Sequence, residues 1–296
     1  MTINRVTQNM MMDRSYLSLQ TGLNRLARTQ EQLTTGRVLN RPSDSPTDTT
    51  SAMRMRAALA DERQHTRNAQ DGLGWLGQID TQVTSMLGQV RRGRELALQG
   101  ANAGVQSPQA REALAAEVDQ LRESLISAAN TTYLGRPVFG GMVSGGAAYD
   151  PAGNYIGVPG DVVRTIAKDV KVKVNVDGPD VFGPVGANVF DDLAALSTAL
   201  RAGDQAGIST AIDALAVAQD RMTSTLADVG TRYNRLDRAV QTSLDTTLSL
   251  TASLSEIENV DLAKATMELS MHEVAYQAAL ASTARLVQPS LSDFLR

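Results

Sequence analysis

Glycine and proline, the residues that most often interrupt helices, are concentrated in the middle of this chain. Residues 135–186 contain 11 of the 23 glycines and 5 of the 9 prolines, whereas the tract from Thr231 onward has no glycine and a single proline, Pro289. Because both residues destabilise helix interiors, the two ends of the chain can form long helices and the middle cannot. The distribution predicts a mainly α-helical chain with a small non-helical insertion.

Apolar residues on both sides of the insertion recur at alternating steps of three and four, as they do along the packed face of a helix. The pattern predicts helices over residues 12–35, 46–101, 107–130, 189–201, 205–258 and 262–287. Two of these would be ~80 Å long and flank the insertion, so we expect an antiparallel helical rod or coiled coil with paired terminal helices. Ser243 and Thr247 interrupt an apolar stripe and should weaken it or fix its register.

The first two helices should be separated by a loop. Gly36 is a suitable C-terminal stop, and Pro42 and Pro46 prevent a continuous helix. Ser45 can cap the next helix, with Asp48 completing a capping box.

The insertion has the pattern of a β-rich module. Residues 170–176 alternate strictly between apolar and polar, which predicts a half-buried strand followed by a turn at Gly178. Residues 149–155 are typical of a turn between two short strands. Only 4% of residues are aromatic, so we expect no large globular core, and we expect the helical rod to form without the module.

These patterns divide the chain into five segments. They are an N-terminal assembly segment (1–45), the first part of the rod (46–134), the β-rich module (135–186), the second part of the rod (187–258) and a C-terminal assembly segment (259–296).

No residue constellation supports catalysis or a bound cofactor or metal. The run from Gly72 to Gly77 matches a dinucleotide fingerprint but lies within a helical pattern, without the strand that such a site needs. His272-Glu-Val-Ala-Tyr276 lacks the second histidine of a zinc-protease motif, and the chain has only two histidines and no cysteine. We therefore expect His272→Ala and Gly74→Ala to be nearly silent.

Charge is distributed unevenly along the chain. Residues 1–60 carry 8 basic and 4 acidic residues, whereas residues 189–296 carry 8 basic and 14 acidic ones. The basic arm lacks interleaved aromatic residues, so pairing with the acidic half or simple solvation is favoured over nucleic-acid binding. No run of 18 apolar residues or signal-peptide pattern is present, which argues against membrane insertion.

The last helix has apolar residues on several sides, which predicts burial against other chains and disordered ends in an isolated monomer. The candidate assembly residues lie on the apolar stripes of the terminal helices. They are Leu19, Leu23, Leu26, Leu33, Leu262, Leu269, Tyr276, Leu280 and Leu286.

Several motifs resemble the bacterial flagellin family. In the N-terminal half they are Leu33-Thr-Thr-Gly-Arg-Val-Leu-Asn-Arg-Pro-Ser-Asp44, Arg67-Asn-Ala-Gln-Asp-Gly-Leu73 and Arg94-Glu-Leu-Ala-Leu-Gln99. In the C-terminal half they are Ile257-Glu-Asn-Val-Asp-Leu-Ala-Lys-Ala265 and Ala278-Ala-Leu-Ala-Ser-Thr-Ala-Arg-Leu-Val-Gln-Pro-Ser-Leu291. The loop Asn40, Arg41, Pro42, Ser43, Asp44 and the ending Leu291-Ser-Asp-Phe-Leu295 are similar to the hook–filament junction branch of that family. No usable match covers residues 141–186.

The resemblance implies an extracellular structural subunit of the flagellum that joins hook to filament. It implies export without a cleaved signal peptide, a cytoplasmic export chaperone, self-assembly into a ring or tubular layer, and contacts with a neighbouring hook-associated protein and flagellin. It also implies terminal helices that pair along an inner tube. Filament flagellin is the nearest alternative, and a cytoplasmic helical scaffold or a nucleic-acid-binding coiled coil is a distant one.

Overall fold

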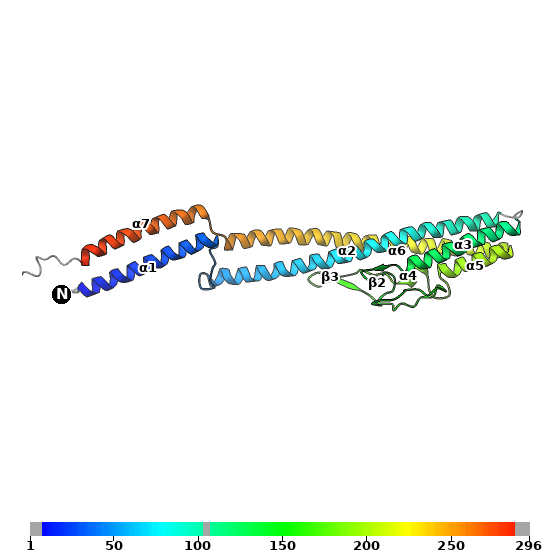
Figure 1. Cartoon of the computed structure of the whole chain (residues 1–296), viewed down its shortest axis with the longest axis horizontal. Helices are drawn as coiled ribbons and strands as arrows, with labels where there is room; N and C mark the ends of the chain where they lie inside the picture. Colours follow the sequence, from blue (N-terminus) through cyan, green and yellow to red (C-terminus); the bar gives the residue numbers. More distant parts are fainter. Residues whose placement is uncertain (1–7, 103–106, 288–296) are drawn as a thin grey trace, which may run out of the picture. The chain divides into compact units, whose positions relative to one another are not determined.

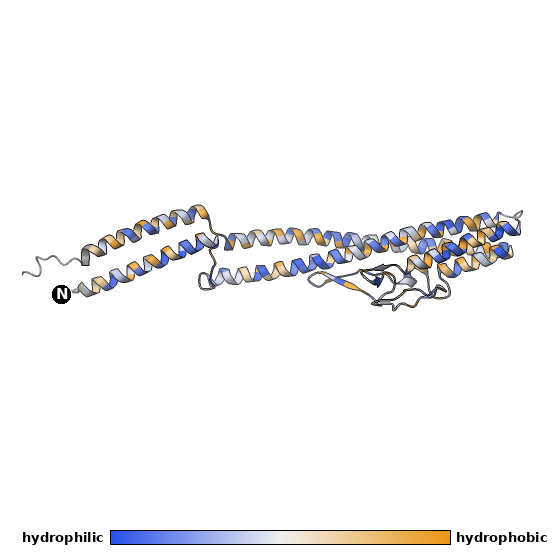
Figure 2. Ribbon diagram, viewed as in Figure 1, coloured by the Kyte–Doolittle hydropathy of each residue, from blue (hydrophilic) through white to orange (hydrophobic). Residues whose placement is uncertain are grey.

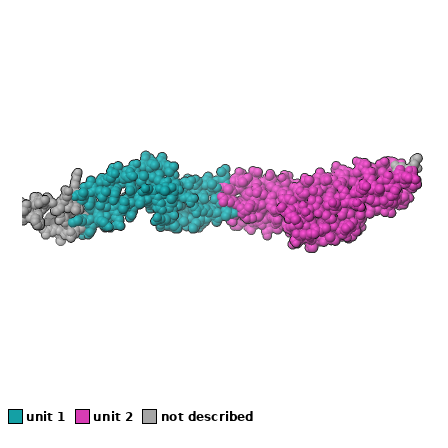
Figure 3. All heavy atoms as spheres, in the orientation of Figure 1, with its two compact units in different colours: residues 1–60, 248–296 teal, residues 61–247 magenta. Residues whose placement is uncertain are grey.

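The structure is a computed structural model that describes residues 8–102 and 107–287. The chain divides into two compact units (Figure 3). Unit 1 combines Met1–Ala60 with Leu248–Arg296, and unit 2 is Asp61–Thr247. Both long helices contribute to both units.

Long helices make up most of the described chain, with short strands in the insertion (Figure 1). The elements in order are α1 (Gln8–Thr35), α2 (Pro46–Ala101), α3 (Pro108–Ala129), β1 (Thr132–Tyr133), β2 (Arg136–Pro137), β3 (Val163–Ala167), β4 (Val170–Lys173), α4 (Gly178–Phe182), α5 (Val189–Ala202), α6 (Gln205–Glu258) and α7 (Leu262–Val287).

The predicted helices are confirmed, most of them within a residue or two of their bounds. At the start of α2, the Ser45 hydroxyl accepts the Asp48 N–H at 3.4 Å, as expected of an N-cap. Asp48 Oδ2 accepts from the Ser45 hydroxyl at 2.7 Å, in place of the backbone N–H of the predicted capping box. Gly36 ends α1 with a φ of +70°, a conformation that glycine adopts without strain. The first helix begins at Gln8, earlier than predicted, and the terminal segments predicted to be disordered are described as helices over Gln8–Thr35 and Leu262–Val287.

Within unit 2, α2 and α6 run antiparallel, as predicted. The Ser243 hydroxyl on α6 donates to Glu62 Oε2 on α2 at 2.7 Å, and Leu236 lies against Gly72 further along both helices. Ser243 is only 5% exposed. A buried polar contact of this kind favours one register because a shifted register would leave the hydroxyl without its partner.

The β-rich module consists of two small antiparallel hairpins and irregular chain, and it begins with β1 at Thr132, just before the predicted bound at residue 135. β1 pairs with β2 and β3 with β4, and an isolated bridge joins Tyr149 to Tyr155 where a turn was predicted. The predicted strand over residues 170–176 is shorter, ending at Lys173, and Gly178 opens helix α4 where we expected a turn. The single turn of α4 is too short to show the apolar periodicity of a helix.

The expectation that the chain has no large core is wrong. Four of the eleven aromatic residues, Phe139, Tyr149, Phe182 and Phe190, are gathered in one place, where they are fully buried with contacting ring centroids 5.0–5.5 Å apart. Residues of the module and of the surrounding helices belong to a single buried cluster. A low overall aromatic content therefore misled the prediction, because concentration of the rings matters more than their number.

Polar side chains also attach the module to the helices of unit 2. Asn130, which caps the C-terminus of α3, accepts the N–H groups of Ala148 and Tyr149 at 2.8 Å and donates to the Tyr149 carbonyl at 2.9 Å. Arg164 in β3 pairs with Asp71 on α2 at 2.7 Å. These contacts argue against the prediction that the rod forms without the module, and the deletion described in the Discussion tests it.

The three glycines of the apparent dinucleotide fingerprint lie inside α2, and two of them, Gly72 and Gly74, have a packing role. A Cβ on Gly72 would approach Leu236 Cδ1 to 2.8 Å, and one on Gly74 would come within 2.4 Å of Tyr133 Oη. Gly74→Ala would therefore require the Tyr133 side chain to shift, which argues against the expectation that this variant is silent.

Candidate assembly site

In unit 1 the two ends of the chain are joined by backbone hydrogen bonds. The Val38 N–H donates to the Glu258 carbonyl at 2.8 Å, and the Val260 N–H donates to the Gly36 carbonyl at 3.0 Å. Arg37 and Asn259 form an antiparallel bridge between these bonds. The loop after α1 and the link before α7 are thus held together, which places the start of α7 beside the end of α1.

Asp44 organises the family-motif loop. Its Oδ2 accepts the N–H groups of Asn40 at 3.1 Å and Arg41 at 2.8 Å, and its Oδ1 accepts from Arg28 Nη2 at 3.0 Å. These contacts hold the pKa of the Asp44 carboxyl below its ordinary value. The hydrogen bond from the Arg41 backbone N–H contributes most, and the Asn40 backbone N–H and the charge of Arg28 act in the same direction. Asp44 therefore fixes the conformation of the motif loop. Arg41 Nη2 also forms an ion pair with Glu31 Oε1 at 3.3 Å.

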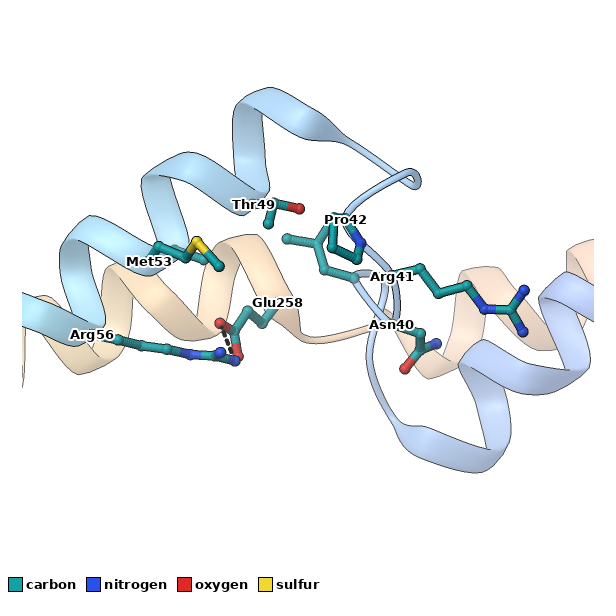
Figure 4. Close-up of a pocket in the computed structure, with 9 residues that line it drawn as sticks. Asn40, Arg41, Pro42, Thr49, Met53, Arg56 and Glu258 are labelled. Atoms are coloured by element: carbon teal, nitrogen blue, oxygen red, sulfur yellow. Dashed lines mark ion pairs between the residues drawn. The ribbon is translucent and has the colours of Figure 1, made fainter.

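Beside this loop, a cavity of about 160 Å³ opens between the loop, α2 and the end of α6 (Figure 4). Arg56 and Glu258 point toward each other at its wall and form an ion pair at 2.7 Å. Glu258 is only 6% exposed, so removal of Arg56 would leave a buried carboxylate without its ion-pair partner. The residues lining the cavity are Leu39, Asn40, Arg41, Pro42, Thr49, Ala52, Met53, Arg56 and Glu258.

Helices α1 and α7 pack along one stripe each (Figure 1). Gly22 lies against Tyr276, with its would-be Cβ 3.5 Å from the ring. The less exposed positions recur at steps of four and three. On α1 they include Ser15, Leu19, Gly22, Leu26, Thr29 and Leu33, and on α7 they include Ala265, Leu269, His272, Tyr276, Ala279 and Thr283. The two helices therefore meet as an antiparallel heptad seam.

Apolar residues occur along both helices (Figure 2), and several of them outside the seam are exposed within the described chain. On α1 these are Met10, Met12, Tyr16, Leu17 and Leu23, and on α7 they are Leu262, Met267, Met271, Val274 and Leu280. Met267, Met271 and Val274 recur at steps of four and three on the face of α7 opposite the seam. Such apolar faces are the mark of a helix that packs between neighbours.

The structure separates the predicted assembly residues into two groups. Leu19, Leu26, Leu33, Leu269 and Tyr276 are half-buried in the seam within one chain. The second group, exposed on the outer surfaces, is Leu23, Leu262 and Leu280. Leu286 lies in α7 but its side chain is outside the described residues, as is the motif from Gln288 onward.

Sequence reasoning missed Thr29, Ala265 and Glu258, which are 5%, 3% and 6% exposed. The first two are signalled by the four–three spacing of the seam, in which small residues count as well as leucines. No local sequence pattern identifies Glu258, because its burial follows from the pairing of residues 36–38 with residues 258–260.

His272 lies in the seam, in a polar hollow shared with Arg25 and Gly22. Within residues 8–102 and 107–287, no group of three or more histidine, aspartate or glutamate side chains is arranged to hold a metal ion. None of the described helices is long and apolar enough to cross a bilayer.

This arrangement of paired ends and long antiparallel helices matches a known protein family. The model of the bacterial flagellin N-terminal helical region matches residues 6–143, and that of the flagellin C-terminal helical region matches residues 212–295. Together the two models cover most of the chain. The chain belongs to the bacterial flagellin family and is a structural component of the flagellum.

Similar proteins include both filament and hook-associated subunits. A flagellin of Halalkalibacterium halodurans is 27% identical over 270 residues, which is 90% of this chain and 89% of the relative. Flagellar hook-associated protein 3 of Escherichia coli is 26% identical over 243 residues, which is 78% of this chain and 74% of the relative.

Solved structures share the fold. FlgL of Bacillus cereus superposes with a TM-score of 0.61 at 21% identity, covering 68% of this chain and 99% of that one. The flagellar junction protein FlgL of Legionella pneumophila superposes with a TM-score of 0.59 at 14% identity, covering 71% of this chain and 100% of that one.

Proposed function

We propose that this chain is the subunit that joins hook to filament, assembling through the outer faces of its terminal helices. The observation that carries the proposal is the Asn40–Asp44 loop, whose sequence is similar to the junction branch and whose Asp44 closes it against Arg28. The similarity to the Escherichia coli hook-associated protein 3 supports the same assignment.

The proposed partners follow from the unfilled surfaces of unit 1. The exposed apolar faces of α1 and α7 would be covered by copies of the same chain in a ring or tubular layer, with a neighbouring hook-associated protein on one side and flagellin on the other. Burial of one exposed leucine or methionine contributes ~1.5–3 kcal/mol, and a ring repeats that gain in every subunit. The role is structural, and no catalytic step is involved.

Export is a further part of the proposal. As a member of the flagellin family, the chain would leave the cell by the flagellar export channel, unfolded and without cleavage. A cytoplasmic chaperone would cover the apolar C-terminal segment before export, because α7 exposes apolar residues on the side opposite the seam.

Filament flagellin is the second candidate. It is supported by the flagellin of Halalkalibacterium halodurans, which covers a larger share of this chain than does hook-associated protein 3. The two functions differ in where the chain lies, since a junction subunit occupies one short zone and a filament subunit the full length.

Gold labelling with an antibody against this chain, viewed on flagella of the parent bacterium, separates the candidates. We expect label at the hook–filament boundary alone. Label along the whole filament would support filament flagellin, and absence from isolated flagella would reject both.

A further inference from the structure

Leu134 in unit 2 combines an unfavourable backbone conformation with an exposed apolar side chain. Leu134 and Gly135 form the two-residue turn between β1 and β2, with φ angles of +50° and +77°. A turn with two positive φ values favours Asn-Gly, and leucine is disfavoured in its first position. Leu134 is nevertheless 74% exposed and gains no packing inside the described chain to offset the strain.

The hairpin that presents Leu134 is held firmly at its base. Tyr133 packs edge-on against Trp75 with ring centroids 5.2 Å apart, and the Arg136 guanidinium lies 5.9 Å from the centre of the Trp75 ring. Val138, just after β2, is buried in the core. Leu134 is therefore an apolar side chain that projects from a well-packed hairpin. Little backbone conformational entropy would be lost when it binds.

The same unit has an open apolar groove between α5 and α6. Its volume is about 460 Å³, and alanines provide most of its apolar lining. They are Ala195, Ala199, Ala202, Ala211 and Ala214. Val217, one turn beyond Ala214 on α6, is 57% exposed and extends the apolar surface. No large side chain of the described chain fills this groove.

We propose that the Leu134 turn of one copy docks in the α5–α6 groove of the next copy. The inference rests on the proposed function as a self-assembling subunit and names the surfaces that unit 2 contributes. Asp192 and Asp204 line the groove, whereas the hairpin, residues 131–137, carries Arg136 and no acidic residue, so the charges are complementary.

A second copy is the occupant that fits these two surfaces. The projecting turn and the receiving groove are different patches of the same chain, so their contact is head-to-tail. Head-to-tail contacts close into rings or continue as helices, whereas a self-complementary patch stops at a dimer. A tubular layer needs the first kind of contact.

Cysteine cross-linking tests the contact directly, because the natural chain has no cysteine. The double variant Leu134→Cys with Ala214→Cys would be produced in the parent bacterium, and isolated flagella would be oxidised and run on a non-reducing gel. We expect a ladder of covalent oligomers larger than a dimer. The matched control, Val158→Cys with Ala214→Cys, places the first cysteine at another exposed apolar site of the module and should give no ladder.

The variant Leu134→Asn separates docking from folding. Asparagine is favoured in this turn, so the monomer should melt at the same or a higher temperature, while incorporation into flagella should fall about tenfold or more because a buried leucine is lost. Unchanged incorporation of Leu134→Asn, or no ladder from the double variant that is present in flagella, would overturn this inference alone. Absence of the unmodified chain from flagella would overturn the proposed function, and this inference with it.

Discussion

At the scale of single residues, Gly72 and Gly88 lie in the same helix in opposite surroundings. A Cβ on Gly72 would press on Leu236 and Val174 at 2.8 and 2.9 Å, whereas a Cβ on Gly88 meets nothing within 4 Å. We expect Gly72→Ala to lower the free energy of unfolding by about 1 kcal/mol or more through overpacking. Gly88→Ala, the matched control, should raise it by ~0.5–1 kcal/mol. Urea unfolding of both variants measures the difference, and shifts of the same sign would refute the packing described for Gly72.

Asp44 provides a prediction about pH at the same scale. Because the folded pKa of its carboxyl is depressed, the stabilisation of the loop is present above its ordinary pKa of ~3.9 and is lost as pH falls through the lowered value. The backbone amide signals of Asn40 and Arg41 should shift together below about pH 4 in an NMR titration. In Asp44→Asn that transition should be absent, and its persistence would show that another group controls the loop.

At the scale of elements, the β-rich module is part of the core of unit 2. Deletion of residues 141–182, joined by a short Gly/Ser linker, removes Tyr149 and Phe182 from around Phe190 and leaves Leu236 without Val174. We expect a large loss of stability, because each buried aromatic ring contributes several kcal/mol. Thermal melting followed by circular dichroism measures it.

A change confined to the exposed β3–β4 turn is the control for that deletion. Asp169→Gly places glycine at a position whose φ is +60°, where glycine is unstrained, and removes no core residue, so melting should be unchanged or slightly higher. An unaltered melting temperature in the 141–182 deletion would mean that the rod is stable without the module after all.

The helices could be predicted from sequence because their signals are local. Four–three spacing, the Ser45 cap and the Gly36 stop each act within a few residues, and they located α2, α6 and α7 correctly. Packing of the module could not be predicted, since it depends on rings that are far apart in sequence. For the candidate site, the stripes identified which residues of α1 and α7 are apolar. They did not reveal which face of each helix packs on the other. Leu23 and Leu26 were both predicted to lie on the stripe, but Leu26 lies in the seam and Leu23 is exposed.

At the scale of the whole molecule, the two groups of assembly residues should behave differently when changed. Leu269→Asp places a charge in the α1–α7 seam, so it should reduce the helicity of the isolated chain as well as its assembly. Leu280→Asp places the same charge on the exposed surface, 43% accessible in one chain, so it should leave helicity and secretion intact and prevent incorporation into flagella. Circular dichroism and electron microscopy measure the two effects. Equal loss of helicity in both variants would argue against the assignment of Leu280 to an intermolecular surface.

The role at the hook–filament junction is tested most directly by deleting the gene for this chain in the parent bacterium. The outcome is read by electron microscopy of the cells and by detection of flagellin in the culture medium. A junction subunit predicts cells with hooks but no filaments, and unassembled flagellin free in the medium. Filaments of normal length attached to hooks, with no flagellin released, would contradict that role.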